Sequence, residues 1–224
     1  MADAANAAVR THLLRSFDTA DGRGAPYRHW RLRDVLPVAL CDAVRALPFA
    51  PPALGEQEGR RDAYNSTRIF CGAENQERFS ACAALADAFQ HPATIARLNT
   101  LCGHCLDGSF LRIEYCLDTA GFWLAPHTDI GAKRFTMLVY LSTGPGSEAW
   151  GTDLLAADGT LVDRPVAGEN SGLIFIPAED TWHGFAPRPI EGVRHSLIVN
   201  YVVPEWQSRH ELAFPERPVT AGVA

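Results

Sequence analysis

The chain has 224 residues, 47% of them hydrophobic, and a formal net charge of −6, which fits a single domain with a sizeable core. It lacks a basic tract or Lys/Arg stripe, so nucleic acid and membranes are not expected as partners, and the oligomeric state stays open. Because no apolar run approaches a membrane span and residues 1–17 lack an apolar signal core, we expect a cytoplasmic protein with its six cysteines reduced.

Residues 1–106 are expected to form a region of helices and strands that packs on the rest. An apolar stripe predicts a helix over residues 3–17, and residues 21–24 resemble a flexible link. Pro37 suits the first turn of a further helix. The remaining expected elements are strands over 27–32 and 65–70 and helices over 37–46, 74–89 and 92–101.

Two features of this region need an interpretation. Residues 48–63 are rich in Pro, Gly and charge, which is typical of a long lid or a disordered loop. Cys102 and Cys105 have the spacing of a redox dithiol, but the expected helix ends there, where its dipole disfavours a thiolate. We therefore expect a helix end and a turn at these cysteines, with no redox role.

Residues 107–204 are expected to form the core, and residues 205–224 a tail. Alternating or apolar segments predict strands over 110–116, 122–129, 135–142, 173–176, 181–186 and 193–203, with a hairpin turn at 157–160. Short strands separated by turns favour a sandwich or barrel, and a two-sheet jelly roll leaves a mouth between its sheets. After Pro204 we expect a short helix to about residue 212 and a loose end beyond Phe214.

Three side chains in the core have the pattern of a metal site. His127 and Asp129 are two residues apart, so on a strand they point to the same face. A second imidazole from His183 would complete a set of two histidines and one carboxylate. Such a set holds one face of an octahedral ferrous ion and leaves the other positions open.

The strand over 193–203 carries a candidate anion site. Arg194 and Ser196 alternate with His195, so they share one face while His195 points the other way. Arginine is suited to a bidentate hold on a carboxylate. The pair can therefore grip one anionic group.

Together, these motifs resemble the iron(II)- and 2-oxoglutarate-dependent dioxygenases, in their prolyl-hydroxylase-like branch. The resemblance implies a mainly β fold with flanking helices and a double-stranded β-helix (jelly-roll) core. It also implies that His127, Asp129 and His183 bind Fe(II), and that Arg194 and Ser196 hold the distal carboxylate of 2-oxoglutarate, with dioxygen as the other cosubstrate. Two family tyrosines that help to bind 2-oxoglutarate match Tyr115, at a slightly longer spacing from the first ligand, and Tyr140.

The expected reaction is hydroxylation of a small polar metabolite, with release of succinate and carbon dioxide; desaturation, epoxidation and ring formation remain alternatives. Arg68, and Trp150 at the end of the loop over 143–151, are candidate substrate contacts. Three other functions stay open. The chain could be a peptidyl hydroxylase, a non-catalytic jelly-roll binding protein or a zinc hydrolase, although a hydrolase would not need Arg194 and Ser196.

Overall fold

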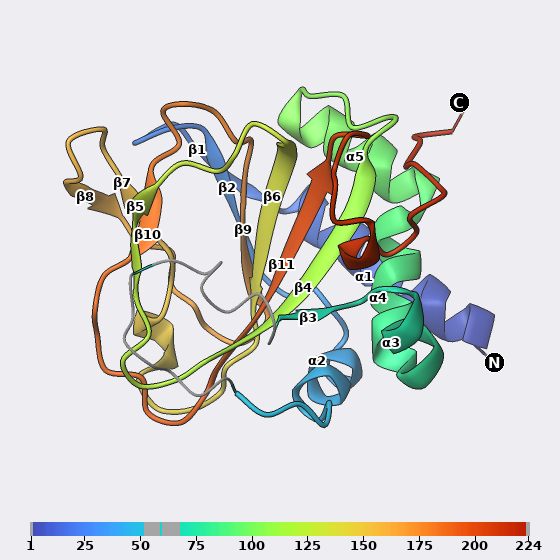
Figure 1. Ribbon diagram of the computed structural model, residues 1–224, viewed down its shortest axis with the longest axis horizontal. Coiled ribbons are helices and arrows are strands. Elements are labelled where there is room, and N and C mark those ends of the chain that lie inside the picture. Colours follow the sequence, from blue (N-terminus) through green and yellow to red (C-terminus); the bar gives the residue numbers. More distant parts are fainter. Residues whose placement is uncertain (1, 52–58, 60–67, 223–224) are drawn as a thin grey trace.

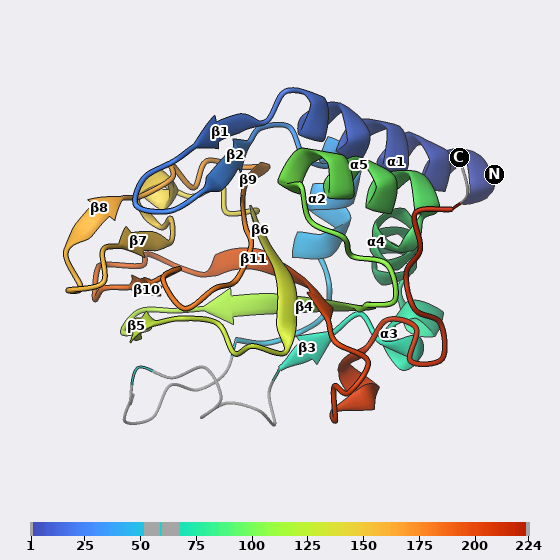
Figure 2. The same cartoon turned by 90° about the horizontal axis from the view of Figure 1, so that it is seen from above.

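A computed structural model describes residues 2–51, 59 and 68–222 of the chain. Helices cover one face of a large antiparallel sheet, and a smaller sheet lies over its other face (Figures 1 and 2). The mainly β fold with flanking helices is as predicted. The helices are α1 (Ala2–Asp18), α2 (Val38–Arg45), α3 (Ala73–Arg78), α4 (Ser80–Gln90) and α5 (Pro92–Cys102).

The large sheet contains strands from both the N-terminal region and the core. Its order is β1-β2-β9-β6-β11-β4-β3, and all its neighbouring strands are antiparallel. Residues 21–24 were predicted to be a flexible link, but most of them form the edge strand β1. The strands are β1 (Asp21–Arg23), β2 (His29–Leu32), β3 (Ile69–Phe70), β4 (Phe110–Asp118), β6 (Lys133–Tyr140), β9 (Ser171–Phe175) and β11 (Arg194–Val202).

The small sheet has the order β5-β10-β7-β8. Its strands are β5 (Leu124–His127), β7 (Asp153–Leu155), β8 (Leu161–Asp163) and β10 (His183–Phe185). The predicted hairpin turn joins β7 to β8. Asp158 Oδ1 accepts a hydrogen bond from the Thr160 amide, and Gly159 adopts a φ of 85° that a glycine tolerates best.

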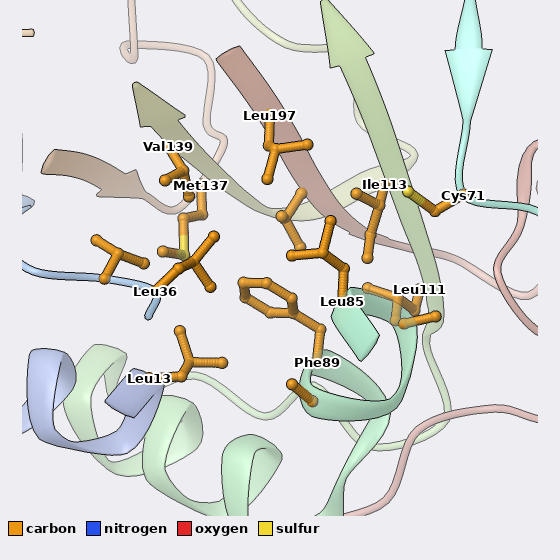
Figure 3. Packing of buried hydrophobic residues seen from close by; sticks show 14 of the residues in the cluster. Leu13, Leu36, Cys71, Leu85, Phe89, Leu111, Ile113, Met137, Val139 and Leu197 are labelled. Atoms are coloured by element: carbon orange, nitrogen blue, oxygen red, sulfur yellow. The ribbon is translucent and has the colours of Figure 1, made fainter. Parts of the chain in front are cut away.

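The main core lies between the helices and the large sheet. Leu13 of α1 and Phe89 of α4 pack toward apolar residues of β4, β6 and β11 (Figure 3). The strands alternate: Leu197 and Val199 of β11 enter this core, while Ile198 between them faces the small sheet. A second apolar cluster, including Leu138 and Phe185, joins the two sheets.

Local signals explain where α5 begins and ends. The His91 side chain accepts a hydrogen bond from the Ala93 amide, and Pro92 occupies the first turn. Gly103 ends the helix in the left-handed conformation, with a φ of 63°. The helix predicted over 74–89 is instead two helices, because Phe79 is extended and packs on Phe49, with the ring centroids 5.5 Å apart.

The C-terminal tail is packed, so the prediction of a loose end beyond Phe214 is wrong. Val219 is 1% exposed and belongs to the main core. Its amide donates to Ser109 O at 2.8 Å, and its carbonyl accepts from the Gly108 amide at 2.9 Å. The short helix predicted after Pro204 is a single 3₁₀ turn, Arg209–Glu211. Among the described residues, no helix is long and apolar enough to cross a membrane.

This packing predicts a measurable contribution of the tail to stability. Val219→Ala should lower the free energy of unfolding by roughly 1.5 kcal/mol, because two buried carbon groups contribute about 0.8 kcal/mol each. Val166→Ala is the matched control, since Val166 is 62% exposed. Urea unfolding measures both variants. Equal, small effects would show that the tail does not pack on the core in solution.

Candidate functional site

Two histidines face each other across the small sheet. His127 of β5 and His183 of β10 are register partners, and their ring centroids are 4.4 Å apart. The strands approach closely beside them: a Cβ atom on Gly184 would lie 3.0 Å from Leu124 O. Glycine after His183 therefore permits the pairing that brings the two rings together.

Backbone hydrogen bonds orient both rings. His127 Nδ1 lies 2.8 Å from Ala125 O, and His183 Nδ1 lies 2.9 Å from Thr181 O. Because a carbonyl oxygen only accepts, each Nδ1 carries a hydrogen, which leaves each Nε2 as the nitrogen that could bind a metal. Burial lowers the pKa of His183 to about 4, although Asp129 acts in the opposite direction. His183 is therefore neutral at pH 7, as a metal ligand must be.

Asp129 completes the cluster from the loop after β5. It lies outside the strand, so the predicted strand geometry applies to His127 alone. Its Oδ2 accepts from Thr136 Oγ1 at 2.6 Å, and its Oδ1 pairs with Lys133 Nζ. Burial acts to raise the pKa of Asp129, but Lys133, His183 and the Thr136 hydrogen bond outweigh it and hold the pKa below its usual value.

The three side chains form a donor set for one metal ion. One ligand atom from each of His127, Asp129 and His183 lies within 4.8 Å of the others. Two neutral imidazoles and a carboxylate are the set typical of non-haem ferrous sites. The structure thus brings these residues together as predicted, and their binding of iron stays a prediction.

A cavity of about 630 Å³ opens between the two sheets beside these ligands. Such a volume is within the range of small-molecule sites. Its wall combines apolar residues of the second cluster with a ring of charged and hydroxyl groups. The polar residues that line it include Arg68, Arg112, Glu114, His127, Thr128, Asp129, Lys133, Thr136, Thr152, His183 and Arg194.

Arg194 lines this cavity from the first position of β11. Its Nε donates to Trp150 O at 2.9 Å, and its Nη1 donates to Asp118 Oδ2 at 2.5 Å. The guanidinium carbon also lies 4.9 Å from the ring centroid of Phe185. Asp118 faces Arg194 directly in the pairing of β4 with β11. The arginine is therefore fixed in place, and an acidic partner compensates its charge.

Ser196 and Tyr140 stand behind the cavity wall. Ser196 Oγ accepts from Arg194 Nη1 at 3.4 Å and does not itself line the cavity. The Tyr140 hydroxyl donates to Thr152 Oγ1 at 2.9 Å, and Thr152 does line the cavity. Both predicted residues are thus one contact away from the cavity, Ser196 through Arg194 and Tyr140 through Thr152.

Tyr115 does not reach the cavity, which corrects its predicted role. It belongs to the main core under the helices, and its hydroxyl lies 2.6 Å from His195 Nδ1. Both residues face the helices because Tyr115 alternates with the cavity-facing Glu114 on β4, as His195 does with Arg194 on β11. The prediction that His195 points away from the metal site is confirmed.

Trp150 is also not a mouth residue. It is 3% exposed and belongs to the cluster between the sheets, where its indole Nε1 donates to Pro189 O at 3.0 Å. It contributes its backbone oxygen to Arg194 instead. The loop over 143–151 contains a 3₁₀ turn, Ser147–Ala149, and the predicted lid over 48–63 lies mostly outside the described residues.

Arg68 does line the cavity, held by an ion pair on β4. Its Nε and Nη2 donate to Glu114 Oε1 and Oε2 at 2.9 and 2.6 Å. Glu114 is 2% exposed and also accepts from Arg112. Sequence reasoning missed Glu114 and Asp118. The sequence does contain a pattern that could have identified both residues: charged residues alternate with apolar ones along the central strand β4.

The Cys102–Cys105 pair is a helix end, as predicted. Cys102 is the last residue of α5 and is buried, which raises the pKa of its thiol to about 12. Cys105 is exposed, and its thiol donates to Asp107 Oδ2. A thiol with such a raised pKa is a poor nucleophile at neutral pH.

Comparisons with solved structures identify the fold. A prolyl-4-hydroxylase from Pseudomonas putida aligns with a TM-score of 0.56 at 18% identity, over 85% of this chain and 94% of that one. A prolyl hydroxylase from Trichoplax adhaerens, solved with a hypoxia inducible factor peptide, aligns with a TM-score of 0.57 at 14% identity, over 88% and 90%. The chain has the fold of these 2-oxoglutarate oxygenases.

The oxygenase fold also extends to a different chemistry. The non-heme alpha-ketoglutarate-dependent epimerase SnoN from nogalamycin biosynthesis aligns over 97% of both chains, with a TM-score of 0.52 at 17% identity. No protein-family model and no curated protein matches the chain. The alignments with solved structures confirm the predicted jelly-roll architecture.

The donor set predicts metal binding that depends on each of its members. His127→Ala, Asp129→Ala and His183→Ala should each weaken Mn(II) binding by more than about 100-fold, since loss of a residue that only orients a ligand already costs 10–100-fold. His195→Ala is the matched control, because this imidazole faces the helices. Calorimetry on folded protein gives the affinities. Wild-type affinity in any of the three variants would remove that residue from the site.

Proposed function

We propose that the protein is an Fe(II)- and 2-oxoglutarate-dependent dioxygenase that hydroxylates a small polar metabolite. The observation that carries the proposal is the convergence of His127, Asp129 and His183 beside a cavity that Arg194 also lines. A non-catalytic binding protein would not need three oriented donors. A zinc hydrolase would not need a buried arginine in the same cavity.

The chain's residues have separate tasks in this proposal. His127, Asp129 and His183 would hold the iron, and their hydrogen bonds to Ala125 O, Thr181 O and Thr136 Oγ1 orient them. When bound, iron(II) with 2-oxoglutarate supplies the activation of dioxygen, with release of succinate and carbon dioxide. The apolar wall between the sheets excludes water from this chemistry.

Arg194 would bind the distal carboxylate of 2-oxoglutarate. Asp118, Trp150 O and Ser196 fix its position, so little entropy is lost when the anion binds. The Thr152 hydroxyl would provide a second contact, since it lines the cavity and is held by Tyr140. Tyr140 and Ser196 then support the anion site from behind.

The primary substrate would occupy the part of the cavity lined by Arg68, Glu114 and Lys133. Charged groups in the wall favour a polar molecule. An apolar molecule would displace water from these groups without replacing the hydrogen bonds that the water made. Trp206 also lines the cavity and offers an aromatic surface. The cavity volume suits a ligand that can be enclosed.

The arginine anchor predicts a selective loss of cosubstrate binding. Arg194→Met alone would remove an ion-pair partner from the buried carboxylate of Asp118, so the variant combines it with Asp118→Asn, and Asp118→Asn alone is the control. The double variant should bind 2-oxoglutarate roughly 10- to 150-fold more weakly than the control, which corresponds to a charge-assisted hydrogen bond of about 1.5–3 kcal/mol. Mn(II) affinity should match in both. An equal loss of Mn(II) affinity would show that Arg194 supports the site generally.

The substrate class is tested by screening the iron-loaded enzyme for succinate formation with a metabolite panel and a peptide panel. We expect stimulation by small polar metabolites, with a product heavier by one oxygen atom. Stimulation by peptides alone would contradict the metabolite proposal and favour a peptidyl hydroxylase. A product with inverted stereochemistry and no added oxygen would favour an epimerase.

A further inference from the structure

Three polar residues form a straight row across the cavity side of the large sheet. Asn200 of β11 is the register partner of Thr136 on β6 and of Arg112 on β4. The three are 0%, 3% and 1% exposed, respectively. Buried polar groups are costly unless each finds a partner. Apolar side chains would be sufficient for packing at these positions. The buried polar row therefore needs another explanation.

Arg112 sets the direction of the hydrogen bonds along this row. Its Nη1 donates to Asn200 Oδ1 at 3.0 Å, while Nε donates to Glu211 Oε2 at 2.6 Å and Nη2 to Glu114 Oε2 at 3.0 Å. Arginine has donors only, so the partner atom on Asn200 must be its amide oxygen. The amide nitrogen of Asn200 is consequently turned toward β6.

Asn200 and Thr136 connect Arg112 to the candidate metal ligand Asp129. Asn200 Nδ2 donates to Thr136 Oγ1 at 3.0 Å. The threonine oxygen accepts this bond, so its single hydrogen is directed to Asp129 Oδ2, 2.6 Å away. Each donor in the row thus has one orientation, and the row ends on the carboxylate.

We propose that Thr136 and Asn200 are positioning residues that hold the Asp129 carboxylate in one orientation for metal binding. This inference rests on the proposed function, because it concerns the same ligand. With Oδ2 held by the Thr136 hydroxyl, a metal would bind Oδ1, which pairs with Lys133 Nζ in this structure. Arg112 contributes by orienting the amide of Asn200.

The test compares Mn(II) affinities of metal-free protein by calorimetry. Thr136→Val keeps the shape and removes the hydroxyl, and it should weaken Mn(II) binding about 10- to 100-fold. Thr136→Ser keeps the hydroxyl and should stay close to wild type. Asn200→Asp keeps the acceptor for Arg112 but loses the donor to Thr136, so it should weaken binding in the same direction.

The double variant Thr136→Val, Asn200→Asp shows whether Asn200 acts through Thr136. In that case the double variant binds Mn(II) no more weakly than the more affected single variant. Additive losses would overturn the proposed order of the row. A Thr136→Val protein that melts at a lower temperature but binds Mn(II) like wild type would overturn the positioning role and make the hydroxyl merely structural.

The wild-type measurement separates this proposal from the function on which it rests. If wild-type protein binds Mn(II) and 2-oxoglutarate while Thr136→Val binds Mn(II) equally well, only the positioning role fails. If the wild-type protein binds neither, the proposed function fails, and the positioning role fails with it. Selective weakening in Thr136→Val, with binding retained in Thr136→Ser, supports both.

Discussion

The antiparallel pairing of β4 with β11 decides which side chains reach the cavity. The two strands pair along their full length, from Arg194 opposite Asp118 to Val202 opposite Phe110. Side chains alternate between the faces of a strand, so a slip of one residue would turn Arg194 and Asn200 into the apolar core under the helices. The apolar residues that alternate with them, such as Leu197, are completely buried there and oppose such a slip.

The cavity side of this sheet carries an unusual amount of buried charge. Arg194 pairs with Asp118, and Arg112 pairs with Glu114 and Glu211. Buried ion pairs are weak contributors to stability, because desolvation offsets much of the attraction. Their evident benefit here is geometric: each pair fixes a side chain that lines the cavity or orients a neighbour of the candidate metal ligands.

The sequence predicted those parts of the site that depend on local spacing. The alternation of β11 correctly separated Arg194 from His195, whereas Asp129 joins His127 from the loop after β5 and not from the predicted strand. Tyr115 was misplaced although it shares one face of β4 with the apolar Leu111 and Ile113. Trp150 was misplaced because its position depends on packing between the sheets. Thr136 and Asp118 were missed because their partners, Asn200 and Arg194, lie on another strand. The tail was predicted to be loose from its prolines, but Val219 anchors it in the core.

The proposed function requires that one centre binds both ferrous iron and 2-oxoglutarate. Its most direct test is an anaerobic titration of metal-free protein with Fe(II) and then 2-oxoglutarate, followed by visible absorption. A centre that binds both gives a metal-to-ligand charge-transfer band only when both are present, and the band saturates at one equivalent of iron. No band from folded protein that has bound iron would contradict it, because 2-oxoglutarate would then not chelate the metal.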